Sequence, residues 1–110
     1  MSRRASGLRA WLLQRISAVY LALYLVYFLF AQAGGHGGFQ AWRAWLSEAP
    51  VLLAMALFFI ALAIHAWVGI RDVIIDYIHH VGLRLLFLSG VGVVLLASLL
   101  WVTMALTEVA

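Results

Sequence analysis

Long apolar runs dominate the pattern of hydrophobic and polar positions along this chain of 110 residues. Three runs cover about residues 16–33, 50–71 and 85–106, and each approaches or exceeds the roughly 20 residues with which a helix crosses a bilayer. Polar positions gather between the runs and before the first one. The pattern therefore predicts an all-α membrane protein with three transmembrane helices, built as a single membrane domain over residues 1–110.

The connection between the first two spans predicts a flexible loop followed by a short helix. The loop is the glycine-rich run 34–38, and the helix is expected over Phe39–Leu46. Trp42 and Trp45 suit the headgroup layer, so this helix should lie in the membrane interface. Pro50 fits the first turn of the second span, because backbone N–H groups in a first turn have no hydrogen-bond partner within the helix.

Composition supports a lipid environment and excludes several kinds of site. Hydrophobic residues make up 67% of the chain and charged residues 10%, which is more apolar surface than a soluble domain of this size can bury. The chain has no cysteine, so disulfides, iron–sulfur ligation and thiolate zinc sites are excluded. The net charge of +3 comes from arginines at the ends of the spans, and no basic stripe with interleaved aromatics predicts nucleic-acid binding.

The arginines also predict an orientation. Six of the seven fall before the first span or between the second and third, and only Arg43 falls between the first and second. The six are Arg3, Arg4, Arg9, Arg15, Arg71 and Arg84. By the positive-inside rule, the N-terminus and the loop after the second span should face the cytoplasm.

His65 is the most informative candidate residue, because it lies inside the second apolar run. An ionisable side chain at that depth is costly and by default indicates a functional site. At about 100° per residue, Gly69, Asp72 and Asp76 share its helix face, and small residues such as Ala61 share it on the other side. A face of small and polar residues should point into a helix bundle and away from lipid.

Three roles for His65 remain open from the residues alone. It could be a neutral imidazole hydrogen-bonded to a neighbouring helix, a proton relay or a haem ligand. A six-coordinate b-type haem would need a second axial ligand at similar depth, but His36 lies in the outer loop and His79 and His80 lie at the interface. A haem-binding chain of this kind would therefore be one subunit of a larger bundle.

Asp76 and Tyr77 lie eleven and twelve residues beyond His65, roughly 17 Å along a continuous helix. That distance places them at the cytoplasmic membrane surface. They could be an ordinary interfacial acid and belt tyrosine. Alternatively, the phenol could donate a hydrogen bond to a quinone carbonyl, with the carboxylate beside it.

Several segments of the chain resemble one known family. They are His65-Ala66-Trp67-Val68-Gly69 followed by Asp76-Tyr77, the entry to the first span Gln14-Arg15-Ile16-Ser17-Ala18, and Leu83-Arg84-Leu85. Together with the length and the three spans, they resemble the D-type hydrophobic membrane anchor of bacterial succinate dehydrogenase, respiratory complex II. The chain would then be a single membrane-anchor domain in the bacterial inner membrane.

The resemblance implies cofactors, partners and residue roles. His65 would be one axial ligand of haem b, with the other supplied by a sister anchor of the C type. Tyr77 would bind ubiquinone with Asp76 beside it, and Arg15 would lie near a haem propionate or the quinone pocket. FAD and Fe–S clusters would belong to a flavoprotein and an iron–sulfur subunit, so the chain would not be an enzyme by itself.

Two rival functions stay open at this point. Within the same family, the chain could be a quinol:fumarate reductase anchor, which runs the reaction in reverse. Outside it, the chain could be a haem-free structural or transporter subunit with His65 as a proton relay. His79 and His80 could assist proton uptake, although solvated interfacial histidines are the simpler interpretation.

Overall fold

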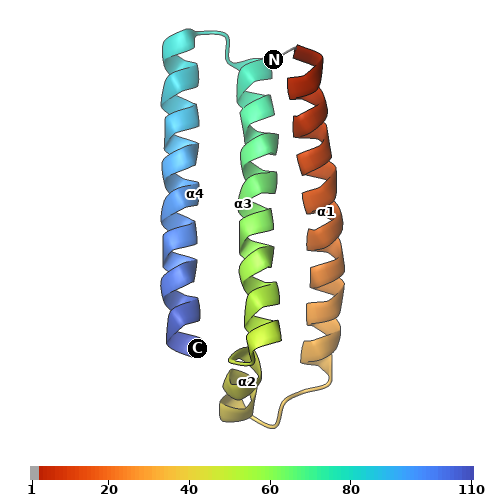
Figure 1. Ribbon diagram of the computed structural model, residues 1–110. Helices are drawn as coiled ribbons and strands as arrows, with labels where there is room; N and C mark the ends of the chain where they lie inside the picture. Colours follow the sequence, from red (N-terminus) through yellow and green to blue (C-terminus); the bar gives the residue numbers. More distant parts are fainter. Residues whose placement is uncertain (1–2) are drawn as a thin grey trace.

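The computed structural model describes residues 3–110, with side chains from residue 7 onward, and consists of four helices (Figure 1). Helix α1 covers Arg3–Ala33, α2 covers Phe39–Leu46, α3 covers Ala49–Tyr77 and α4 covers Val81–Val109. The three long helices are each long and apolar enough to cross a membrane. The prediction of an all-α protein with three spans is confirmed, and α2 has the bounds that the sequence predicts.

The long helices extend beyond the apolar runs that predicted them. Helix α1 begins about thirteen residues before the expected span, and α3 continues past Arg71 to Tyr77. Residues such as Leu8, Arg9 and Ala10 have high helix propensity, so the helix continues where the apolar pattern stops. The side chains of Arg3 and Arg4, two of the orientation signals, lie outside the described residues.

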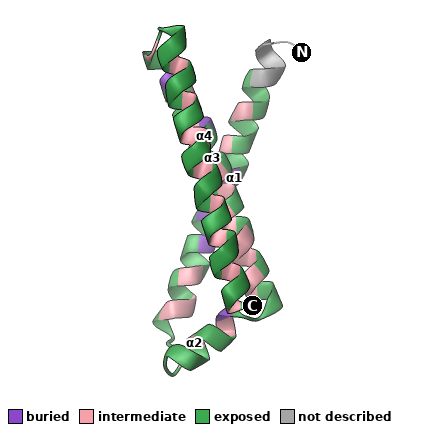
Figure 2. Ribbon diagram, turned by 90° about the vertical axis from the view of Figure 1, so that its left-hand side faces the viewer, coloured by how far each residue is buried: buried purple, intermediate pink, exposed green. Residues whose placement is uncertain are grey.

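The three long helices stand in a row with α3 in the middle (Figure 1). Helices α1 and α4 pack against opposite sides of α3. In the view turned by 90°, α1 crosses the line of α3 and α4 (Figure 2). The N-terminus and the turn after α3 lie at one end of the row, which we call the N-terminal end, while α2 and the C-terminus lie at the other, the α2 end.

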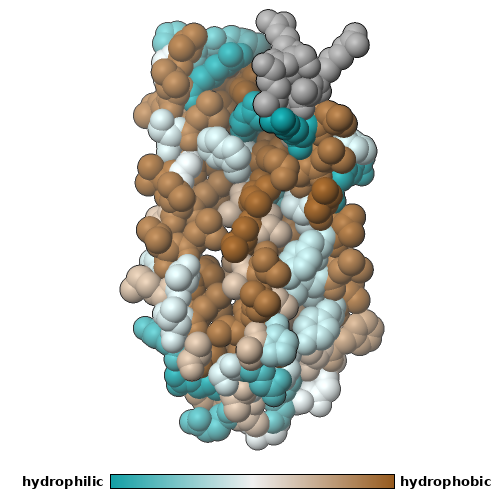
Figure 3. Space-filling view, in the orientation of Figure 1, coloured by the Kyte–Doolittle hydropathy of each residue, from teal (hydrophilic) through white to brown (hydrophobic). Residues whose placement is uncertain are grey.

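This single layer of helices leaves most apolar side chains uncovered. The accessible surface is 8030 Å², whereas a soluble monomer of this mass would expose about 6,000 Å². Exposed side chains include Phe30 and Trp101, and α4 has no buried residue. Figure 3 shows a broad apolar band with polar surface at both ends. Lipid and partner helices, rather than water, are the fitting surroundings for such a band.

The connection at the α2 end is tied down by polar contacts. Gly35, Gly37 and Gly38 have backbone φ values of 71°, 82° and 114°. Residues with a side chain rarely adopt such values, so this turn requires glycine. Trp42 Nε1 donates a 2.9 Å hydrogen bond to Gln32 Oε1, which fixes α2 to the end of α1. The short helix is therefore held in place by the chain itself.

Two arginines cap the C-terminal ends of long helices. Arg43 of α2 donates to the carbonyl of Glu108 at 3.0 Å. Arg84 of α4 donates to the carbonyls of Ile75, at 2.8 Å, and Ile78. The last carbonyls of a helix lack intrahelical partners and carry partial negative charge, so each guanidinium satisfies groups that would otherwise be unpaired at a membrane edge.

Candidate functional site

His65 lies where α3 packs against α1, and it is half-buried within this chain. Its Nδ1 is 3.2 Å from Oγ of Ser17 on α1. Ser17 is 6% exposed and is the one polar side chain that is buried among residues 7–110. At His65 the side chain points into the bundle as expected, because the imidazole meets a neighbouring helix, whereas Asp72 and Asp76 on the same face are exposed.

The Ser17 hydroxyl has a second partner on its own helix. It donates to the backbone carbonyl of Gln14 at 3.1 Å. The imidazole, the hydroxyl and the carbonyl thus form a continuous chain of polar contacts inside an apolar region. Within the described residues, the other ring nitrogen of His65, Nε2, has no hydrogen-bond partner from the protein.

A hollow of about 330 Å³ opens beside the imidazole. Its lining consists of Gln14, His65, Ala66, Gly69, Ile70 and Val73. A Cβ atom added at Gly69 would lie 3.3 Å from Gln14 Nε2, so the missing side chain gives room to the amide. Gln14 Oε1 is buried and has no hydrogen-bond partner among the described residues. The hollow is thus lined by an imidazole, an amide side chain, two small residues and two apolar side chains.

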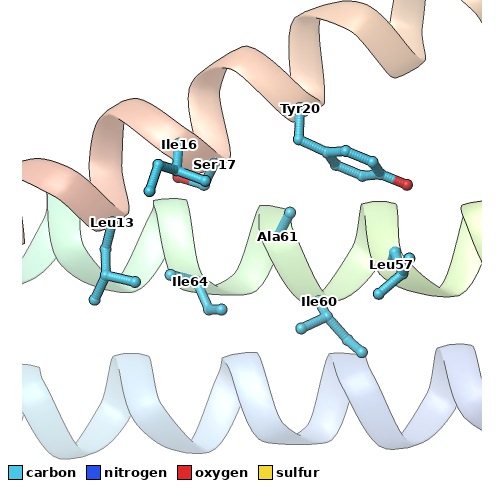
Figure 4. Close-up of a pocket in the computed structure, with 8 residues that line it drawn as sticks. All are labelled: Leu13, Ile16, Ser17, Tyr20, Leu57, Ile60, Ala61 and Ile64. Carbon is cyan, nitrogen blue, oxygen red and sulfur yellow. The ribbon is translucent and has the colours of Figure 1, made fainter.

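A second hollow of about 280 Å³ lies on the other side of the α1–α3 contact (Figure 4). Ile64 lines this second hollow and Ala66 the first, and at 100° per residue they lie on opposite sides of His65. Ser17 and Tyr20 are its only polar lining residues, and Tyr20 donates to the carbonyl of Ala54 at 2.7 Å. This side of the contact is therefore apolar packing space.

The structure does not bring Arg15 to His65 within this chain. Arg15 is two residues from Ser17, about 200° around α1, and its side chain is exposed. Its guanidinium lies 5.6 Å from the ring centre of Trp11, in cation–π geometry. Gln14 and Ser17 are the α1 residues that reach the His65 region instead.

Asp76 and Tyr77 lie on the last turn of α3, which is unbroken from His65 onward. The separation of roughly 17 Å along the axis therefore applies. Both side chains are exposed, and Tyr77 is 79% exposed. By angle, Asp76 shares the face of His65, and Tyr77 lies about 120° from it, on the side of the Gln14 hollow. Within the described residues no element covers this pair.

The turn after Tyr77 is ordered by Arg84 and His80. His80 precedes α4, and its Nδ1 accepts the backbone N–H of Leu83 at 3.2 Å, as an N-cap does. His79 is exposed. The exposed Arg71 and Asp72 approach to 4.0 Å, as expected for a weak interfacial pair.

The donor set fits a haem axial site better than a metal site formed by this chain alone. Among residues 7–110, no three His, Asp or Glu side chains gather closely enough to hold a metal ion. A haem takes a single nitrogen from each side, and His65 offers one beside a hollow with small residues. Gln14, whose buried amide oxygen has no hydrogen-bond partner among the described residues, also lines this hollow.

Sequence reasoning did not single out Ser17 and Gln14 as site residues. Both lie in the Gln14-Arg15-Ile16-Ser17-Ala18 segment, in which only Arg15 was predicted as a site residue. A signal was present in the three-residue spacing of Gln14 and Ser17, which places two polar side chains on one helix face just inside an apolar span. Such a face indicates a polar partner on a neighbouring helix.

Comparison with known proteins identifies the family of the chain. The family model described as the succinate dehydrogenase/fumarate reductase transmembrane subunit matches residues 1–106. The succinate dehydrogenase hydrophobic membrane anchor subunit of Coxiella burnetii (strain RSA 493 / Nine Mile phase I) is 27% identical over 101 residues, which cover 91% of this chain and 86% of the relative. The chain therefore belongs to the family of succinate dehydrogenase/fumarate reductase transmembrane subunits.

Proposed function

We propose that this chain is the membrane anchor of a succinate dehydrogenase, in which it supplies one axial ligand to haem b and part of the ubiquinone-reduction site. As a member of its family it is a multi-pass subunit of an inner-membrane oxidoreductase complex, and not an enzyme by itself. The observation that carries the finer proposal is the placement of His65. His65 is half-buried at mid-helix, its Nδ1 lies 3.2 Å from Ser17 Oγ, and the residue lines a hollow.

The residues around this hollow suit a flat macrocycle. Ala66 and Gly69 present little side chain, so a planar group could approach the α3 backbone closely. Gln14 offers an amide at the edge of the hollow. Haem b, when bound, would supply a one-electron carrier, and this chain would supply the His65 nitrogen, the close backbone approach and apolar walls that exclude water.

A second nitrogen ligand for the haem would come from another chain. No other histidine of this chain shares the depth of His65, since His36, His79 and His80 lie outside the spans. We propose that a sister anchor protein encloses the hollow and provides it. The uncovered apolar surface of the three-helix layer supports such a neighbour.

The quinone role is proposed for the last turn of α3. Ubiquinone reduction consumes two electrons and two protons, and the Tyr77 hydroxyl can donate a hydrogen bond to a quinone carbonyl. Asp76, one residue earlier, would orient the phenol or pass protons from the aqueous side. Arg15 is the candidate for a charge-assisted bond to a haem propionate or to the quinone pocket. The high exposure of Tyr77 leaves room for an iron–sulfur subunit and the sister anchor to complete the pocket.

The division of labour follows from the residues available. The chain has no cysteine to ligate an Fe–S cluster. We propose that FAD and the Fe–S clusters lie on a flavoprotein and an iron–sulfur subunit bound at the N-terminal end. Both directions of the succinate–fumarate reaction are compatible with the family description, and the name of the bacterial relative favours succinate oxidation.

A reduced-minus-oxidised optical spectrum of the purified complex tests the haem assignment. We expect b-type absorbance in the wild type and its loss in His65→Ala, with the four subunits still recovered together. Val68→Ala, a truncation of a buried α3 neighbour, is the control for general damage to the helix. Undiminished haem absorbance in His65→Ala would contradict the assignment, and a wild-type complex without b-type absorbance would favour the proton-relay alternative.

A further inference from the structure

We infer that Ser17 is a positioning residue for His65, whose hydroxyl oxygen accepts the Nδ1–H of the imidazole and leaves Nε2 as the nitrogen that binds iron. The inference rests on the proposed role of His65 as haem ligand and adds the hydrogen bond that orients its ring. Its starting point is the burial of Ser17, which is 6% exposed in the α1–α3 contact.

The direction of the hydrogen bonds follows from the two partners of the hydroxyl. A serine hydroxyl has one proton, and its oxygen can accept from other donors. The Gln14 carbonyl, 3.1 Å away, can only accept, so the serine proton belongs there. Oγ then faces Nδ1 of His65 at 3.2 Å with its lone pairs, and the imidazole has to donate.

The opposite arrangement brings two acceptors together. If Ser17 donated to Nδ1, its oxygen would face the Gln14 carbonyl across 3.1 Å with no proton between two acceptors. Nε2 would then carry the ring proton and could not bind a metal. The arrangement with Nδ1–H as donor gives the serine proton and the ring proton an acceptor each, and it leaves the lone pair of Nε2 for a metal.

The same bond holds the ring and tunes its basicity. A metal-binding histidine commonly donates its second N–H to an oxygen, which fixes the tautomer and ring orientation and makes the ligating nitrogen more basic. Here the oxygen comes from a different helix, so the register between α1 and α3 sets the orientation of the ring. A more basic ligand stabilises ferric over ferrous iron, so the Ser17 bond should lower the haem potential.

The decisive comparison is between Ser17→Thr and Ser17→Val in the assembled complex. The two side chains have nearly the same shape, and only threonine keeps the hydroxyl and its bond to the preceding turn. The apolar hollow bordered by Ser17 provides space for the added methyl groups in both variants. Ser17→Ala gives a smaller variant without a hydroxyl, in case the larger valine disturbs assembly.

Three readouts report on the ligand itself: the midpoint potential of the haem, the low-spin ferric EPR signal, and the rate of haem transfer to an apo-globin acceptor. We expect Ser17→Val and Ser17→Ala to raise the potential, shift the EPR signal and release haem about tenfold faster. Ser17→Thr should retain wild-type values.

Two control variants remove comparable bonds that do not reach His65. Tyr20→Phe removes another hydrogen bond between α1 and α3, and Ser98→Ala removes a serine-to-carbonyl bond within α4. Both should match the wild type in all three readouts. A change in these controls as large as that in Ser17→Val would overturn the specific role of Ser17.

The remaining outcomes separate this inference from the proposed function. If His65→Ala abolishes the b-type spectrum while Ser17→Val and Ser17→Ala keep the wild-type potential, EPR signal and haem release, the ligand assignment stands and the Ser17 inference fails. Equal changes in Ser17→Thr and Ser17→Val would assign the effect to packing and would also overturn it. If His65→Ala retains the spectrum, both proposals fall.

Discussion

The middle and the N-terminal end of this molecule hold their polar residues in opposite ways. At mid-helix, the His65 imidazole has a partner on α1 within the same chain, and that partner is buried. At the N-terminal end, Asp76 and Tyr77 are exposed, and no described element covers them. One site is prepared by this chain, while the other offers groups to its surroundings.

The difference reflects what each depth of a membrane demands. In the hydrocarbon region an unsatisfied polar group is expensive, so a chain that places histidine there needs a partner close by. At the membrane surface, water or another subunit can satisfy a phenol or a carboxylate. We therefore expect the middle to keep its geometry without partners, and the N-terminal end to gain its geometry on assembly.

The largest effect on turnover should come from Tyr77→Phe. The loss of the hydroxyl would leave a quinone carbonyl without its proposed donor, which at about 1–3 kcal/mol corresponds to roughly 5- to 150-fold slower quinone reduction. Succinate oxidation with an artificial acceptor should be nearly unchanged, because we propose that the flavin and Fe–S chemistry lies on other chains. Tyr27→Phe, which alters another exposed tyrosine within a span, is the matched control. Equal quinone reduction in Tyr77→Phe and wild type would remove the N-terminal end from the quinone site.

Gly69→Leu should fill the hollow beside His65 and reduce haem binding without unfolding the subunit. Even a Cβ at this position lies 3.3 Å from the Gln14 amide, and a leucine side chain would extend into the hollow beside His65. Leucine favours helices more than glycine does, so α3 should persist. We expect a substantially lower haem-to-protein ratio in the purified complex. Gly90→Leu adds the same side chain to α4 in open space, and an equal loss there would show that the hollow is not the cause.

Arg84→Gln should loosen the N-terminal end and leave the middle unchanged. The variant removes the guanidinium that bonds the carbonyls of Ile75 and Ile78, at about 1–3 kcal/mol of local stability. Amide hydrogen exchange in the turn over residues 78–83 should speed up, and quinone reduction should fall because Tyr77 loses its support. The haem spectrum should not change. Arg71→Gln removes a charge from a weak exposed pair and should have a smaller effect on exchange.

The sequence predicted the parts of this architecture that depend on one helix at a time. Apolar run lengths predicted the three spans, and tryptophans after a glycine-rich loop predicted α2 with its observed bounds. The 100° rotation per residue predicted that His65 and Gly69 share a face, and both line one hollow. The sequence did not predict how far α1 extends before its span, because helix propensity continues where hydrophobicity stops.

The features that depend on two helices could not be predicted in the same way. The pairing of Ser17 with His65 requires the register of α1 against α3, which no periodicity within either segment contains. For the same reason the sequence predicted Arg15 as a site residue in place of Gln14 and Ser17, although Arg15 faces away from His65 within this chain. The role of Arg84 as a cap of α3 depends on the turn geometry at residues 78–80. The sequence shows that a residue is basic, but which group it bonds depends on how the helices pack.

The smallest expected effect, from Tyr20→Phe, gives the most direct test of whether the middle is prepared by this chain. Hydrogen bonds between membrane helices average about 0.6 kcal/mol, since the separated helices find other partners. Loss of the Tyr20 bond to Ala54 should therefore lower the thermal stability of the complex only slightly, while the haem potential stays at its wild-type value. The reason is that Ser17, one turn of α1 before Tyr20, holds the His65 ring. The overall packing between α1 and α3 does not. A shift in potential with Tyr20→Phe would instead mean that the orientation of His65 depends on the whole contact between the two helices, and the middle would then rely on assembly as much as the N-terminal end does.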